Sequence, residues 1–269
     1  MDRFITRPFV RLSLATGIVA GFGIGGGAFT AVALGVPPGT AWAALAQAHA
    51  HAQLFGFAGL MVFGVALVFL PRLRGAPLQG AHLVPWVLAL YGGGVLLRLV
   101  CQSAAPFLAQ AGLGGVALAA SLGAAAGAWL ALAGASLAVA LLVRTGLSGP
   151  PLAHRAGLRQ VLPLVVTAWL GLLAALAVNA WGTWESMAAW QSVPGRIPSV
   201  GDAPWLLSPA LDALAVRLAF LGWLVPMSVA FAARNFPLLL WAKPAPGRWL
   251  AWGLAALIAG LMLDVAATL

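Results

Sequence analysis

Two histidines, His49 and His51, stand two residues apart inside a long apolar run, in the segment QAHAHAQLFGF (47–57). Neutral imidazole is a ligand for iron, copper and zinc. In a regular helix, residues i and i+2 are about 200° apart, so the two rings point to opposite sides and cannot chelate one ion together. The spacing therefore favours two ligands on opposite flanks of one helix, such as two haems, or a haem and a separate metal.

The composition predicts that this helix crosses a membrane. The chain has 269 residues, of which 62% are hydrophobic and 7% charged, and its mean hydropathy is +1.01. A helix needs about 20 apolar residues to cross the hydrocarbon core of a bilayer. Seven such runs predict an all-α integral membrane protein with a single transmembrane helical domain over residues 1–269. The predicted helices cover about residues 8–35, 43–71, 81–103, 113–144, 160–182, 208–241 and 248–268.

Positive charge is distributed unevenly over the loops between these helices. If the loops alternate between the two sides, one side receives 11 of the 14 Lys and Arg residues. By the positive-inside rule, the N-terminus is cytoplasmic and the C-terminus external. The net charge of +9 is therefore a topology signal rather than a sign of nucleic-acid binding.

With this orientation, His49 and His51 lie in the outer third of the second helix, where ionisable groups are costly and usually functional. The alternative is a packing role, in which one histidine bonds a neighbouring helix and the other extends toward the membrane interface.

Other polar residues are predicted at the same height in the outer half of the bundle. Arg98 and Cys101 lie near the outer end of the third helix, and Asp212 and Arg217 near that of the sixth. Guanidinium binds carboxylates through paired hydrogen bonds, so Arg98 and Arg217 facing the histidines resemble an arrangement for haem propionates. The alternative is an ion pair, of Arg98 with Asp264 or of Arg217 with Asp212.

The remaining polar residues are assigned to loops and packing. His82 and His154 fall on the cytoplasmic side and are predicted to be solvated. The longest polar segment, 183–208, is external, and its tryptophans are typical of an interfacial belt. The Gly-rich stretches 21–27 and 112–136 are typical of small-residue helix faces that pack closely in lipid, and they also leave room for a flat cofactor.

A repeat is the other long-range pattern. The second and sixth helices align at an offset of 166 residues, which matches Gly56 with Gly222. A genuine repeat places helices one to three parallel to helices five to seven, with the fourth helix as connector, about an axis along the membrane normal. Chance matching in a chain rich in Ala, Leu and Gly is the alternative. The histidine pair is not duplicated, because Arg217 takes the position of His51.

The segment AHAHAQLFGFAGLMVFGVALVFLPRLRG (48–75) resembles the His-x-His helix of two groups of membrane proteins. One is the NnrS family, whose members contain haem and copper and are linked to nitric oxide metabolism. The other is subunit I of the haem-copper oxidases and nitric oxide reductases. The segment VAFAARNFPLLL (229–240) also resembles the Arg-x-x-Pro helix end of NnrS-like proteins.

This resemblance implies that His49 and His51 are axial haem or metal ligands near the external face, with haem b as cofactor and copper as a further metal. It implies the bacterial cytoplasmic (inner) membrane as location, and nitric oxide, oxygen or an electron carrier as partner. The chain is shorter than those proteins, which indicates a reduced relative that binds one or two haems with few protein ligands.

Two other functions fit the same pattern. Parallel repeats with an external polar cluster are typical of a transporter or channel, here for a metal ion or small anion. The small-residue faces also suit an accessory subunit of a respiratory complex, or a homo-oligomer. The sequence contains no phosphate loop, Ser/His/Asp set or zinc-protease motif, and it leaves open whether the protein is an enzyme.

Overall fold

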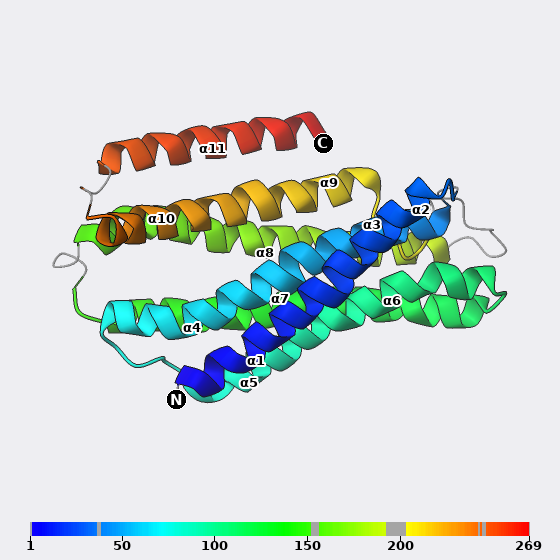
Figure 1. Cartoon of the computed structure of the whole chain (residues 1–269), viewed down its shortest axis with the longest axis horizontal. Helices are drawn as coiled ribbons and strands as arrows, with labels where there is room; N and C mark the ends of the chain where they lie inside the picture. Colours follow the sequence, from blue (N-terminus) through cyan, green and yellow to red (C-terminus); the bar gives the residue numbers. More distant parts are fainter. Residues whose placement is uncertain are drawn as a thin grey trace. The chain divides into compact units, whose positions relative to one another are not determined.

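The computed structural model describes residues 2–36, 39–151, 156–191, 203–241, 243 and 246–268. His154 and residues 192–202 of the predicted external segment lie outside these ranges. Every regular element in the described part of the chain is helical, and seven helices are long and apolar enough to cross a membrane (Figure 1). This confirms the predicted seven-helix membrane architecture.

The seven spans are built from the following elements. The first comprises α1 (Asp2–Ala15), η1 (Thr16–Phe22) and α2 (Gly23–Ala33), and the second comprises α3 (Thr40–His51), η2 (Ala52–Gly59) and α4 (Leu60–Arg74). The third comprises η3 (Ala81–Leu83), α5 (Val84–Val87), η4 (Leu88–Gly92) and α6 (Gly93–Gln110). The fourth is α7 (Gly114–Ser148), the fifth α8 (Ala156–Gln191), the sixth α9 (Pro209–Arg217), η6 (Leu218–Leu224) and α10 (Val225–Leu239), and the seventh α11 (Gly247–Thr268).

The fifth helix differs from its prediction. It was expected to end near residue 182, but α8 continues to Gln191, so the predicted start of the external segment at residue 183 is wrong. Ala180, Thr183 and Met187 are all buried at helical spacing on one side of α8. The buried stripe therefore extends past the apolar run that marked the span in the sequence.

The chain forms two compact units. The first comprises Met1–Ser148 and Asn179–Asp212, and thus holds the first four spans together with the end of the fifth helix. The second comprises Gly149–Val178 and Ala213–Leu269.

Small residues bring the third and fourth spans of the first unit into backbone contact. A Cβ placed on Gly94 would lie 2.5 Å from the amide nitrogen of Ala131, and one placed on Gly127 would lie 2.6 Å from that of Arg98. No side chain fits between the backbones at these positions. The close packing predicted for 112–136 is confirmed, and it fixes the backbone that carries Arg98.

Four spans contain a π-helical stretch, namely η1, η2, η4 and η6. π-helical turns interrupt the regular backbone hydrogen bonding of an α-helix and are frequent at functional sites. In η2, the carbonyl of Phe55 accepts a hydrogen bond from the Tyr91 hydroxyl at 2.9 Å, and the carbonyl of Phe57 accepts one from the Ser13 hydroxyl at 2.7 Å. Neighbouring helices thus stabilise the irregular turn that begins directly after His51.

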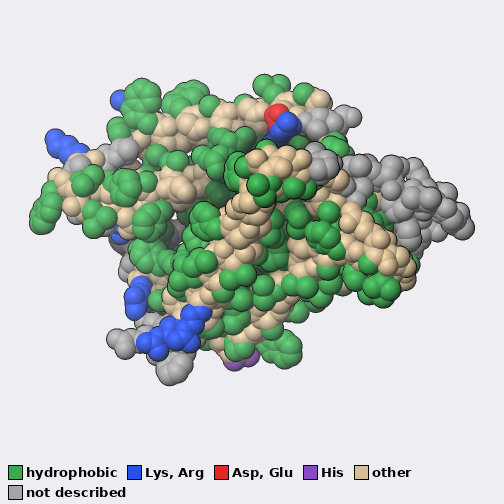
Figure 2. All heavy atoms as spheres, turned by 45° about the vertical axis from the view of Figure 1, so that its right-hand side comes forward, with side chains coloured by type: hydrophobic (Ala, Val, Ile, Leu, Met, Phe, Trp, Pro, Cys, Tyr) green, Lys and Arg blue, Asp and Glu red, His purple; other side chains and the backbone are tan. Residues whose placement is uncertain are grey.

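Large hydrophobic side chains are exposed along the helices, as the visible face in Figure 2 shows. In the first span they include Ile18, Val19, Phe22 and Phe29. In α11 they include Trp249, Trp252, Met262 and Leu263. Apolar surfaces of this length suit contact with lipid.

Local structure agrees with the predicted repeat. The π-helical stretches η2 and η6 both begin at the same place under the offset of 166 residues, Ala52 and Leu218. The matched glycines also behave alike: Gly56 packs against Thr16 of the first span, and Gly222 against Gly171 of the fifth. The parallel axis relating the two copies stays a prediction.

The contact at Gly94 allows a direct test of the helix packing. We expect Gly94→Ala to lower the free energy of unfolding by about 1–3 kcal/mol, because backbone atoms cannot move away as a side chain can. Gly93 is the matched control, since nothing lies within 4 Å of a Cβ built there. Gly93→Ala should be neutral or stabilising by up to about 1 kcal/mol. Equal thermal unfolding curves for the two variants in detergent would contradict the packing.

Candidate functional site

His51 is the last residue of α3 and lies in the interior of the first unit, with 3% of its surface exposed. Its ring packs against that of Phe55, at 5.1 Å between centroids. Neither ring nitrogen has a hydrogen-bond partner among the described residues. His51 is ten residues from Ala41, where the second candidate span begins, so it lies roughly 15 Å below that end.

Arg98 of α6 lies beside His51 and interacts with it electrostatically. Only 1% of its surface is exposed. Its Nε donates to Gln102 Oε1 at 3.3 Å, whereas its Nη1 has no partner among the described residues. Asp212, in the first turn of α9, attracts the guanidinium as well. A buried charge is strongly unfavourable unless it is paired and hydrogen-bonded, so this arginine needs an explanation.

His49 points to the other side of the same helix, as its spacing from His51 predicts. Its Nδ1 lies 2.7 Å from the carbonyl oxygen of Gly21 in the first span, and its ring packs against Gly25. Because a carbonyl can only accept, Nδ1 carries the proton and Nε2 keeps its lone pair. This hydrogen bond is the one that the packing alternative expects for one histidine. It is also how metal-bound histidines are oriented.

The packing alternative does not account for His51. It expected the second histidine to extend toward the interface, but His51 is buried and its polar atoms have no partner in the described structure. Unpaired buried polar groups are rare in native proteins, and each points to a partner or a function.

A short segment covers the outer side of this site. Ala203–Leu207, which we call the strap, is buried throughout. The side chain of Gln47 accepts from the backbone amide of Leu207 at 3.1 Å and donates to its carbonyl at 3.0 Å. Gln102 Nε2 donates to Gln47 Oε1 at 2.9 Å and to the carbonyl of Trp205 at 3.1 Å. Two glutamines of the second and third spans thus hold the strap in place.

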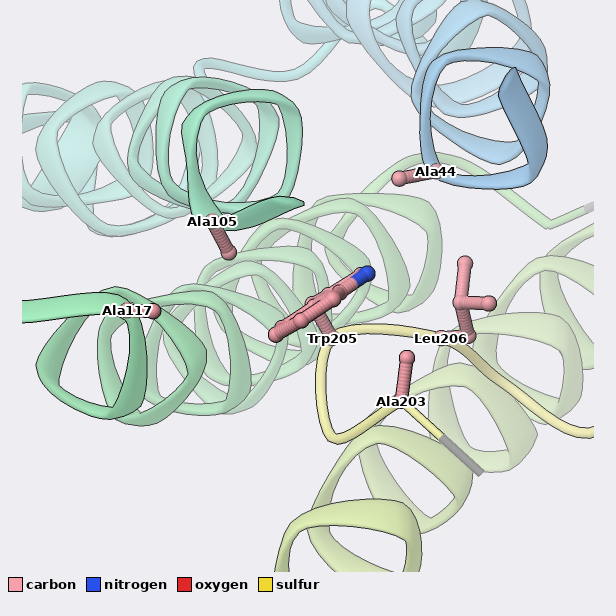
Figure 3. Close-up of a cluster of buried hydrophobic side chains, with 6 residues drawn as sticks. All are labelled: Ala44, Ala105, Ala117, Ala203, Trp205 and Leu206. Atoms are coloured by element: carbon pink, nitrogen blue, oxygen red, sulfur yellow. The ribbon is translucent and has the colours of Figure 1, made fainter. Parts of the chain in front are cut away.

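Trp205 is the side chain that anchors the strap in the bundle. Its ring lies among small side chains, with Ala105 and Ala117 on one side and Ala44 on the other (Figure 3). Only 4% of Trp205 is exposed, so its assignment to an interfacial belt is wrong. The segment folds back between the helices, where alanines leave room for an indole. Trp181, with 58% exposed, keeps the belt-like position.

Arg217 lies in the second unit, where its Nη1 is 3.0 Å from Oδ2 of Asp264. Both side chains are 39% exposed. An ion pair was predicted as the alternative to ligand binding, but with the partners exchanged: Arg217 was matched with Asp212, and Arg98 with Asp264. Arg98 and Asp212 instead belong to the first unit.

The offset of 166 residues relates these two pairs. It places Arg217 at the position of His51 and Asp264 at the position of Arg98. In each unit the two equivalent positions face each other, as an ion pair in one and as His51 beside Arg98 in the other. The match of Arg98 with Asp264 is present in the sequence and would have identified the correct partner of Arg217.

Sequence reasoning also missed Gln47, Gln102 and the strap. The signal was the presence of two amide side chains inside apolar runs. Cys101 faces Gly123 of α7, where a built Cβ would lie 2.7 Å from its sulfur, so it packs as a small apolar group. Within the described residues, no three His, Cys, Asp or Glu side chains gather in a way that could hold a metal ion.

Comparisons of the chain with protein-family models, with curated proteins and with solved structures return no match. The fold defines the class directly: the protein is a seven-helix integral membrane protein. Its outer half contains a buried His51–Arg98 site beneath a strap.

The strap contacts predict that Gln47 limits access to the site. Gln47→Ala removes both backbone hydrogen bonds of Leu207, each worth about 1 kcal/mol. On a Cys101→Ser background, we expect a cysteine at Leu206 to react with an externally added thiol reagent roughly tenfold faster when Gln47 is Ala.

Gln79→Ala is the control, because its side chain contacts only the carbonyl of Pro77 among the described residues. Equal labelling rates in the Gln47→Ala and Gln79→Ala backgrounds would show that the glutamine contacts do not hold the strap.

Proposed function

We propose that the protein binds haem in the outer half of its first unit, with His51 as the principal axial ligand. The observation that carries this proposal is the burial of the His51 imidazole with both ring nitrogens unpaired in the described structure. Burial favours the neutral ring, and neutral imidazole is the form that ligates iron. An iron ion would take one nitrogen and end the cost of leaving it buried without a partner.

Arg98 fits the same cofactor. Haem carries two propionates, and a guanidinium is well suited to bind a carboxylate. Arg98 lies beside His51 and its Nη1 has no partner in the described structure, so it can receive a propionate without breaking an existing bond. Arg217 is not included, because its guanidinium is already paired with Asp264.

His49 is the proposed ligand on the opposite flank. The carbonyl of Gly21 holds its Nδ1–H, which leaves Nε2 available to a second haem or to copper. His49 is less buried than His51, so its ligand would lie closer to the surface of the unit. The order of ligand strength is therefore expected to be His51 before His49.

Bound haem would supply one-electron chemistry and a coordination position for a gas. We propose nitric oxide or oxygen as that ligand, or an electron carrier at the external face, in a bacterial inner membrane. The protein would hold the cofactor through His51, compensate its carboxylates through Arg98 and limit access from outside through the strap.

The test is a titration of hemin into purified, haem-free protein in detergent, followed at the Soret band. We expect wild type to bind one or two haems, and His51→Ala to lose a Soret-shifted complex or to bind at least tenfold more weakly. His82→Ala is the matched control, because His82 is exposed at the other end of the third span. All variants are compared by size-exclusion profile to show that the fold persists.

Protein that is well folded and shows no saturable Soret complex would contradict the proposal. The alternative of a transporter for a metal ion or small anion would then lead, and uptake into proteoliposomes would be the next measurement.

A further inference from the structure

The two copies of the repeat complete their paired site in different ways. In the second unit, the guanidinium of Arg217 faces the carboxylate of Asp264 at 3.0 Å. In the first unit, the equivalent positions hold an imidazole and a guanidinium, His51 and Arg98. One copy therefore contains a cation with its anion, and the other contains a cation beside a neutral hydrogen-bonding group.

The unpaired atoms show what the first site lacks. Three nitrogen atoms have no partner among the described residues, both of His51 and Nη1 of Arg98. Whichever tautomer His51 adopts, one of its nitrogens donates, and every guanidinium nitrogen donates. Two donors and a positive charge at one buried place call for an acceptor with two oxygens and a negative charge.

We propose that His51 and Arg98 bind the carboxylate, or a similar planar oxyanion, of a ligand, in the role that Asp264 has beside Arg217. The site itself stands on the unpaired atoms and the repeat, while one possible source of the carboxylate, a haem propionate, rests on the proposed function. His51 donates through one nitrogen and keeps the other for iron, so a single ligand can engage both groups.

Asp212 is the nearest rival for this role. It attracts Arg98 and is half-buried, but it leaves Nη1 of Arg98 and both nitrogens of His51 unpaired in the described structure. Its charge lowers the cost of burying Arg98 and opposes a second anion. Removing that charge with Asp212→Asn should therefore strengthen anion binding.

The experiment uses formate as the probe and thermal unfolding of the haem-free full chain as the readout. A ligand that binds only the native state raises the unfolding temperature with its concentration. We expect sodium formate to raise it more than sodium chloride at equal ionic strength in wild type and, more strongly, in Asp212→Asn. Arg98→Gln should abolish the formate effect. Arg217→Gln is the matched control at the repeat-related site and should retain it.

A second variant covers the case in which Arg98→Gln does not fold. His51→Asp supplies a carboxylate beside Arg98 within the chain, as in the second unit. We expect this variant to be more stable than His51→Ala without any added anion and to show no formate response. A formate response equal to that of chloride in wild type, together with no gain from His51→Asp over His51→Ala, would overturn the proposal.

The source of the carboxylate is distinguished by titrating hemin and its dimethyl ester, in which both propionates are esterified. If haem supplies the carboxylate, the ester should bind about tenfold more weakly and formate should compete with hemin. If a free anion is the ligand, both haems bind equally and formate still stabilises the loaded protein. A formate response without any haem binding would refute the haem proposal and support the anion site.

Discussion

Within a bilayer, a polar group that is buried in protein must find its partner in the protein or in a ligand, because water is scarce at that depth. The first unit follows this constraint at most of its interior polar atoms. The carbonyls in the π-helical stretch of the second span receive hydroxyl groups from Tyr91 and Ser13, and Gln47 and Gln102 bind each other and the strap. His51 and Arg98 depart from it, although they are among the most buried side chains.

The difference between the two copies of the repeat gives this departure a physical meaning. A chain that needed only stability at these positions has a solution in its second unit, where Arg217 and Asp264 neutralise each other. The first unit instead keeps a guanidinium with one unpaired nitrogen next to an unpaired imidazole, which lowers stability until a ligand binds. Such stored binding capacity is typical of functional sites, and the strap above it separates the site from the external face.

The sequence predicted the features that follow from composition and helical periodicity. Apolar runs define the seven spans, because crossing a bilayer requires them. The two-residue spacing places His49 and His51 on opposite flanks, since the helix turn fixes their directions. The end of the fifth helix was predicted too early, because Thr183 and Met187 are buried beyond the apolar run.

Features that depend on contacts distant in sequence were not predicted. Trp205 belongs to the interior because Gln47 and Gln102, more than a hundred residues away, hold its backbone or that of Leu207. The partner of Arg217 was assigned by nearness in the chain, although the repeat offset carried the correct information. The π-helical turns have no local pattern in this sequence, since they depend on the hydroxyl groups that neighbouring helices provide.

The most direct test of the central claim is the haem content of the protein as it is purified from a membrane, without added cofactor. A pyridine haemochrome spectrum, with iron and copper measured on the same sample, gives the amount per chain. The account predicts haem b at one or two per chain, with an iron content to match. A monodisperse protein with neither haem nor iron, even when the host is supplied with haem precursors, would contradict it.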